Sequence, residues 1–254
     1  MSSKDTKETN VLAQASILMV AGIVTRIIGV LYRSPVTSII GDEGNGYYSI
    51  AVNIYTMILL ISSYSIPMAV SKVVSAKMAV HQYKIAHKVF KCALMYVLII
   101  GGIASLITFF GASILIPSNQ PKAIPVLRIL APTIFFSGFL GVFRGYFQGC
   151  GTMIPTAISQ ILEQLLNAVV SIAGASMLMD YGLKMAQQQD NELLGPAYAA
   201  AGGTLGTVSG AVIGLLFLLF CYYASRKVIC RRVNRDRSRR VESYSSIFKL
   251  MILT

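Results

Sequence analysis

Long apolar stretches, separated by short polar segments, recur along nearly the whole chain. A helix that crosses a membrane needs roughly 20 consecutive, mostly apolar residues. Stretches of that length lie at Val11–Tyr32, Tyr47–Val74, Val89–Ile116, Ile124–Phe147, Ile154–Met179 and Ala197–Ala224. The pattern therefore predicts an all-α fold, a polytopic transmembrane helix bundle of about six spans.

The segments between these spans carry residues that end helices. Ser34–Gly46 and Gln187–Pro196 contain Gly, Pro, Asp and Asn, so both are predicted to be loops. Pro67 lies inside the second predicted span, and a proline there removes a backbone donor and bends the helix.

The ends of the chain differ from its apolar body. Residues 1–10 are polar and are predicted to be a tail, residues 11–225 form the helical lobe, and residues 226–245 form a basic linker. Residues 246–254 turn apolar again, which predicts the start of a truncated seventh helix. An amphipathic segment on the membrane surface is the alternative.

Composition supports a membrane protein, since 55% of the residues are hydrophobic and only 13% are charged. The formal net charge of +12 is also typical of nucleic-acid-binding proteins, but the basic residues lie between the spans. Basic residues in that position set the orientation of a membrane protein and attract anionic lipids. Membrane lipids, and no nucleic acid, are the expected partners.

Lys and Arg are disfavoured in segments that cross the membrane during insertion, so their distribution predicts which side each loop occupies. The predicted inner segments carry Lys72, Lys77, Lys84, Lys88, Lys91, Arg226, Lys227, Arg231, Arg232, Arg235, Arg237, Arg239, Arg240 and Lys249. The predicted outer loops carry Asp42, Glu43, Asp180, Asp190 and Glu192. We expect a multi-pass protein of the bacterial cell membrane with both termini in the cytoplasm.

Small residues line one face of the sixth span. Gly202, Gly206, Gly210 and Gly214 follow one another at four-residue steps, and Gly138, Gly141, Gly145 and Gly149 form a looser pattern in the fourth span. Glycine faces let two membrane helices approach closely. These positions are expected to be helix-packing sites, and they indicate no particular activity.

Charged residues inside the spans are candidates for function, because an ionised side chain in hydrocarbon costs about 2.5 kcal/mol or more. Arg26 and Arg33 lie seven residues apart and so share a face of the first span. A binding role is one interpretation. The alternatives are a structural role for Arg26 and a position of Arg33 at the membrane surface, reached by its long side chain.

The fifth span carries a polar stripe on an otherwise apolar helix: Gln160, Glu163, Gln164 and Asn167. Such a stripe lines a water-filled path or forms hydrogen bonds between helices, and the sequence leaves both open. Arg144 and Gln148, near the end of the fourth span, are candidates to pair with Glu163 or to bind a phosphate. An interfacial position of both residues is the alternative.

The sequence contains no nucleotide-binding loop, no His/Cys cluster with metal-ligand spacing and no nucleophile beside a plausible base. We therefore expect a transporter rather than an enzyme, with no catalytic residue, no metal and no cofactor.

Five segments, read in order, resemble one family of membrane proteins. They are TRIIGVLYR (25–33), IGDEGNGYY (40–48), IPMAVSK (66–72), RGYFQG (144–149) and PTAISQILEQ (155–164). In these segments the chain resembles the stage V sporulation protein B family. This family is the polysaccharide-biosynthesis branch of the multidrug/oligosaccharidyl-lipid/polysaccharide flippase superfamily, related to the MurJ-type lipid II flippases.

The resemblance implies two lobes of helices around a central cavity that opens alternately to either side of the membrane, of which this chain is the amino-terminal lobe. Members move polyprenyl-pyrophosphate-linked saccharides for cell-wall or spore-cortex synthesis. By analogy, Arg26, Arg33 and Arg144 are candidate pyrophosphate contacts and Glu163 a cavity carboxylate. A second lobe or a second copy is an expected partner.

Two departures from the MurJ-type pattern weaken lipid II as the inferred substrate. The second span has no arginine between Tyr48 and Ser71, and Arg33 is followed by Ser34 where that relative has Asp. An ion-coupled multidrug-type exporter and a non-transporting assembly partner of cell-wall enzymes remain alternative functions.

The orientation can be tested by cysteine accessibility in cells, with the native cysteines replaced. A cysteine introduced within 187–194 should react with an impermeant reagent from outside. One introduced within 235–240 should react only after permeabilisation. The reverse labelling would show that the orientation is wrong.

Overall fold

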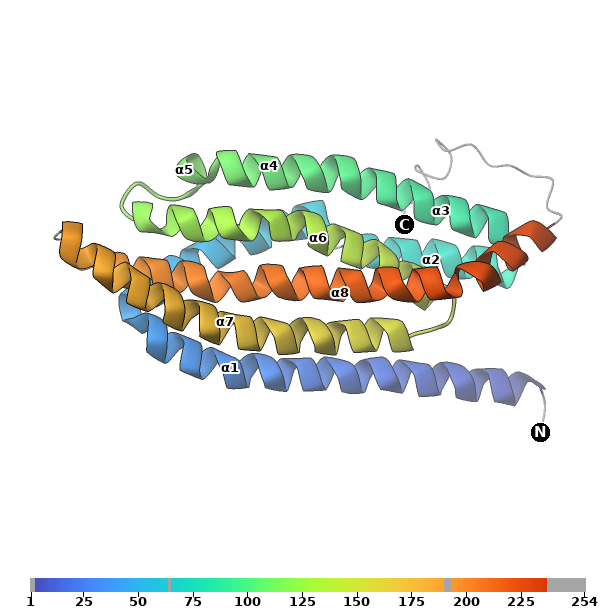
Figure 1. The fold of residues 1–254 in the computed structure, drawn as a ribbon. Coiled ribbons are helices and arrows are strands. Elements are labelled where there is room, and N and C mark those ends of the chain that lie inside the picture. Colours follow the sequence, from blue (N-terminus) through green and yellow to red (C-terminus); the bar gives the residue numbers. More distant parts are fainter. Residues whose placement is uncertain (1–2, 64, 190–192, 237–254) are drawn as a thin grey trace.

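The computed structural model describes residues 3–63, 65–189 and 193–236, and all regular secondary structure in these ranges is helical (Figure 1). The α-helices are α1 (Ser3–Ser62), α2 (Ile66–Ala79), α3 (Tyr83–Tyr96), α4 (Gly102–Phe110), α5 (Ala112–Leu115), α6 (Ile124–Gly149), α7 (Ile154–Gln189) and α8 (Leu194–Arg235). A π-helical turn, Val97–Gly101, joins α3 to α4, and a 3₁₀ turn, Pro121–Ala123, precedes α6.

Within the described residues, 5 helical segments are long and apolar enough to cross a membrane: Ala13–Ala79, Tyr83–Phe110, Pro121–Gly149, Ile154–Gln187 and Leu194–Arg231. The first of them has 67 residues and folds back on itself, so it accounts for the first two predicted spans (Figure 1). Large apolar side chains also cover the outside of the bundle, for example Ile61 and Ile114, which are 84% and 87% exposed. The chain is thus a multi-pass membrane protein built as an all-α bundle.

The reversal of α1 takes place at a single residue. Gly41 has φ 72° and ψ 176°, while the residues on both sides of it are helical. Glycine reaches positive φ at little cost because it has no Cβ. The predicted loop Ser34–Gly46 is therefore wrong. Pro35 lies inside the helix, and Asp42 and Glu43 begin its second half, where the helix dipole favours acidic residues.

The second predicted span is interrupted rather than bent. The helix α1 ends at Ser62 and α2 begins at Ile66, with Pro67 in the first turn of α2. A first turn tolerates proline, because its N–H groups have no partner within the helix. The third predicted span lies earlier than expected, over Tyr83–Phe110.

Several of the predicted boundaries lie inside helices. The helices α7 and α8 extend well beyond Met179 and Ala224, and α1 already begins at Ser3, within the predicted tail. The reason is that hydropathy marks only the apolar part of a helix, whereas backbone hydrogen bonding continues into polar residues. The described part of the predicted loop 187–196 is mostly helical for the same reason. The predicted seventh helix, 246–254, lies outside the described residues.

The helices α7 and α8 pack with their backbones in contact. A methyl group added to Gly174 would lie 2.5 Å from the carbonyl oxygen of Gly202, and one added to Gly210 would lie 2.6 Å from that of Glu163. Gly206 likewise lies directly on the backbone of α7 at Asn167. No larger residue fits at Gly174 of α7, or at Gly206 and Gly210 of α8, without separating the helices.

The other glycines of both patterns also lie at helix contacts. A methyl group on Gly214 would be 3.3 Å from Leu140, and one on Gly138 would be 2.7 Å from Val97. Gly141, Gly145 and Gly149 of α6 lie against α2, at Pro67, Val70 and Val74.

The start of α1, the α2–α3 turn, the α6–α7 connection and the end of α8 lie at the same end of the bundle (Figure 1). Two side chains connect these segments. Gln14 Oε1 accepts a hydrogen bond from the Met153 N–H at 3.1 Å, and Asp236 Oδ2 accepts one from the Lys84 N–H at 2.8 Å. Each pairs a backbone donor near a helix start that has no partner within its helix.

The glycine contact predicts that Gly206→Leu disrupts the bundle. The added side chain would meet the backbone of α7, and overpacking a tight contact costs about 1–3 kcal/mol or more. Gly22→Leu is the matched control, because a Cβ at Gly22 meets nothing within 4 Å. Thermal unfolding in detergent should show a lower melting temperature for Gly206→Leu only. Equal melting of both variants would show that the α7–α8 contact is not tight.

Candidate functional site

The clearest polar contact inside the bundle joins α6 to α7. Arg144 Nη2 lies 2.6 Å from Glu163 Oε2, and Arg144 Nε donates a hydrogen bond to Ser159 Oγ at 3.1 Å. The Ser159 hydroxyl in turn donates to the Thr156 carbonyl at 2.7 Å. The guanidinium is thus held by two residues one helical turn apart on α7.

This ion pair is accessible from outside the protein. The Arg144 and Glu163 side chains are 17% and 28% exposed, so neither charge is sealed in the core. Gln148, the other α6 candidate, has no hydrogen bond to Glu163 among the described residues. Of the two α6 candidates, Arg144 is therefore the one that contacts the polar stripe of α7.

Farther along the stripe, Asn167 connects α7 to α1, and Ser171 connects α7 to α8. Its Nδ2 donates to the Tyr32 hydroxyl of α1 at 3.2 Å, and its Oδ1 lies 3.0 Å from Ser171 Oγ. The Ser171 hydroxyl also lies 2.7 Å from the carbonyl oxygen of Gly203 in α8. Asn167 thus forms hydrogen bonds between helices, which is the second of the two interpretations that the sequence allows for the stripe.

The two glutamines of the stripe behave differently. Gln164 lies beside α1, where a methyl group on Gly29 would come within 3.1 Å of its Nε2. Gln160 Oε1 and Thr156 Oγ1 are buried, and neither has a hydrogen-bond partner among the described residues. A buried oxygen without a partner is energetically unfavourable. These two oxygens of α7 can therefore accept hydrogen bonds from another molecule.

Tyrosines that were not among the candidates from the sequence also face this region. Tyr55, in the second half of α1, lies near Ser137 of α6, Glu163 of α7 and Tyr48 of its own helix. Tyr48 in turn lies close to Tyr32 and Arg33. Tyr48 and Tyr55 are seven residues apart, and this spacing on a single helical face was the available signal.

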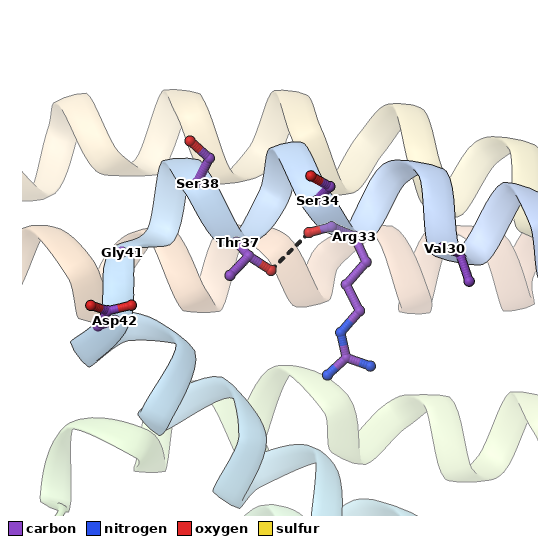
Figure 2. Close-up of a pocket in the computed structure, with 7 residues that line it drawn as sticks. All are labelled: Val30, Arg33, Ser34, Thr37, Ser38, Gly41 and Asp42. Carbon is purple, nitrogen blue, oxygen red and sulfur yellow. Dashed lines mark hydrogen bonds between the residues drawn. The ribbon is translucent and has the colours of Figure 1, made fainter.

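Arg26 and Arg33 are exposed on α1, and neither forms an ion pair with a described residue. Arg33 lies in a groove of about 640 Å³ at the reversal end of the bundle. Figure 2 shows its side chain extending into the angle between the two halves of α1. The other lining residues are Val30, Ser34, Thr37, Ser38, Gly41 and Asp42.

The arrangement is therefore a partly exposed ion pair, flanked by spare acceptors and tyrosine hydroxyls, and a separate arginine groove. Arginine binds phosphate oxygens in pairs, and hydroxyl groups bind sugar hydroxyls. No contact in the structure joins Arg26 or Arg33 to Arg144 or Glu163 within the described residues. These groups can hold an anionic headgroup without performing covalent chemistry.

Comparison with known proteins identifies the family. The family described as polysaccharide biosynthesis protein matches residues 11–252. The chain belongs to this family. No solved structure matches the chain.

Two proteins of Bacillus subtilis (strain 168) are similar to this chain. Stage V sporulation protein B is 29% identical over 222 residues, which cover 85% of this chain and 40% of the relative. Lipid II flippase MurJ is 25% identical over 224 residues, which cover 83% of this chain and 39% of the relative. The chain thus spans about two fifths of the length of these relatives.

The ion pair predicts a non-additive effect on stability. Arg144→Met leaves the Glu163 carboxylate without its cation, and losing one partner of a partly buried pair costs about 1–3 kcal/mol. The double variant Arg144→Met/Glu163→Gln should recover most of that loss, while Arg128→Met, at an exposed arginine of α6, should have little effect. The melting temperatures of wild type, Arg144→Met, Glu163→Gln, the double variant and Arg128→Met are compared in detergent. Equal melting of the single and double Arg144 variants would contradict the prediction.

Proposed function

We propose that this chain forms one lobe of a membrane flippase that moves a polyprenyl-pyrophosphate-linked saccharide across the bacterial cell membrane by alternating access. The partly exposed Arg144–Glu163 pair in the bundle carries the proposal. The family and the names of its relatives, a lipid II flippase and a sporulation protein, support it. The product would serve cell-wall or spore-cortex synthesis.

The positions of the arginines suit a diphosphate ligand. A diphosphate that leaves water must be neutralised, since an unpaired charge in an apolar environment is very unfavourable. Arg144 is on α6, and Arg26 and Arg33 are on α1. Cations on two helices would allow the headgroup to be held while the helices move, and the hydroxyl-lined groove at Arg33 would contact the saccharide.

The chain covers only about 40% of the length of stage V sporulation protein B. A complete central cavity would therefore need a second lobe or a second copy of this chain. In this proposal both termini are cytoplasmic. The segments that carry the lysines of the α2–α3 turn and the arginines near the end of α8 share one end of the bundle (Figure 1).

A second candidate function is export of amphiphilic cations, in exchange for an ion. The tyrosines near Glu163 favour it, because aromatic faces and a carboxylate bind cations. The three arginines oppose it, since they would repel such a substrate.

The diphosphate site can be tested on the chain in lipid nanodiscs, by titration with undecaprenyl pyrophosphate. Arg26→Ala should weaken binding about tenfold, as expected for a lost charged contact. Arg26→Lys should fall between this variant and wild type, because an ammonium group cannot hold two phosphate oxygens in a fixed fork. Arg128→Ala removes one positive charge outside the proposed site, so it is the control and should bind as wild type does.

Undecaprenol, which has the same tail without the diphosphate, should bind much more weakly than the pyrophosphate. Equal binding of the two lipids would refute the proposed function. Unchanged binding by both Arg26 variants would remove Arg26 from the site.

A further inference from the structure

Arg144 is held in a way that leaves one of its contacts exchangeable. Its Nε is hydrogen bonded to Ser159, which is completely buried, whereas its Nη2 contacts the partly exposed carboxylate of Glu163. The first contact fixes the guanidinium on α7. The second can be replaced by an incoming anion without moving either helix.

Arg144 is the one cation in contact with Glu163 among the described residues. On the α8 side, Gly210 and Gly214 lie against the backbone and Cβ of Glu163 and bring no side chain. Among the described residues of α1, the titratable group that lies near Glu163 is the Tyr55 hydroxyl. A tyrosine hydroxyl is neutral near pH 7. Within the described residues, Glu163 therefore has one cationic partner, and that partner lies on a different helix.

We infer that Glu163 takes up a proton when Arg144 turns from it to a bound diphosphate, so that ligand binding at this site is linked to proton binding. This inference rests on the proposed function. A diphosphate competes well for Arg144, because a guanidinium holds two of its oxygens at once. The carboxylate would then lie beside a second anion without a cation, and both desolvation and like charge favour its neutral form.

The exchange balances in charge and protons. One proton passes from water to the Glu163 carboxylate as Arg144 leaves it. The same proton returns to water when the diphosphate departs and the Arg144–Glu163 contact forms again. Since the bound state holds one proton more than the free state, affinity rises as pH falls, by at most about tenfold per pH unit.

The measurement is calorimetry of the chain in nanodiscs with undecaprenyl pyrophosphate, in two buffers of different ionisation enthalpy, which gives the protons bound per ligand. Wild type should take up about one proton more than Glu163→Gln. Glu163→Gln removes the carboxylate that competes with the ligand for Arg144, so it should bind the ligand more tightly than wild type. The protons that it binds per ligand give the baseline for ionisation of the diphosphate itself. Asp180→Asn, an exposed carboxylate on the same helix, is the matched control and should behave as wild type.

Normal binding with equal proton numbers in wild type and Glu163→Gln would overturn the inference and leave the proposed function in place. Absence of diphosphate binding by wild type would overturn both. If Glu163→Gln does not fold, infrared difference spectra of wild type decide. A protonated carboxylic-acid band that appears on ligand addition, shifts in frequency in Glu163→Asp and is unchanged in Asp180→Asn supports the inference, and its absence overturns it.

Discussion

The direct backbone contact between α7 and α8 determines where the polar groups of this bundle can lie. Inside a membrane, helices gain little from burying apolar side chains against one another, so close packing and hydrogen bonds hold them together. Gly202, Gly206 and Gly210 allow α8 to lie on the backbone of α7 at the level of Glu163 and Asn167. The polar stripe of α7 is therefore turned toward α1 and α6, because α8 occupies the remaining side with small residues.

That constraint divides the polar residues of α7 into two groups. Asn167 forms a hydrogen bond to α1 and Ser171 forms one to α8, so these two residues hold helices together. Among the described residues, Glu163 by contrast has a single charged partner and remains partly exposed, and Gln160 has an unpaired oxygen nearby. A stripe that looks uniform in sequence thus serves packing at one end and leaves binding capacity at the other.

The reversal at Gly41 has a similar consequence for α1. It turns the second half of the helix back along the first, so that Arg33 and Tyr48, on opposite sides of the turn, lie close together. The groove at Arg33 lies at this turn, and Gly41 and Asp42 are part of its lining. A flippase lobe with its charges on α1 and α6 would combine this groove with the ion pair on α7.

The sequence by itself determined the bundle, since hydropathy and length suffice to place membrane helices, and its motifs indicated the family. The sequence also predicted which glycines lie at helix contacts. A four-residue spacing puts residues on one face of a single helix, so it can be recognised without knowing the neighbouring helices. Only the tertiary structure decided that Arg144 pairs with Glu163, that Asn167 meets Tyr32, and that Tyr55 faces the same region. These contacts join residues on different helices, whose rotation and separation depend on packing. The break at Gly41 was likewise hidden, because the polar residues around it suit a loop and a helix start equally well.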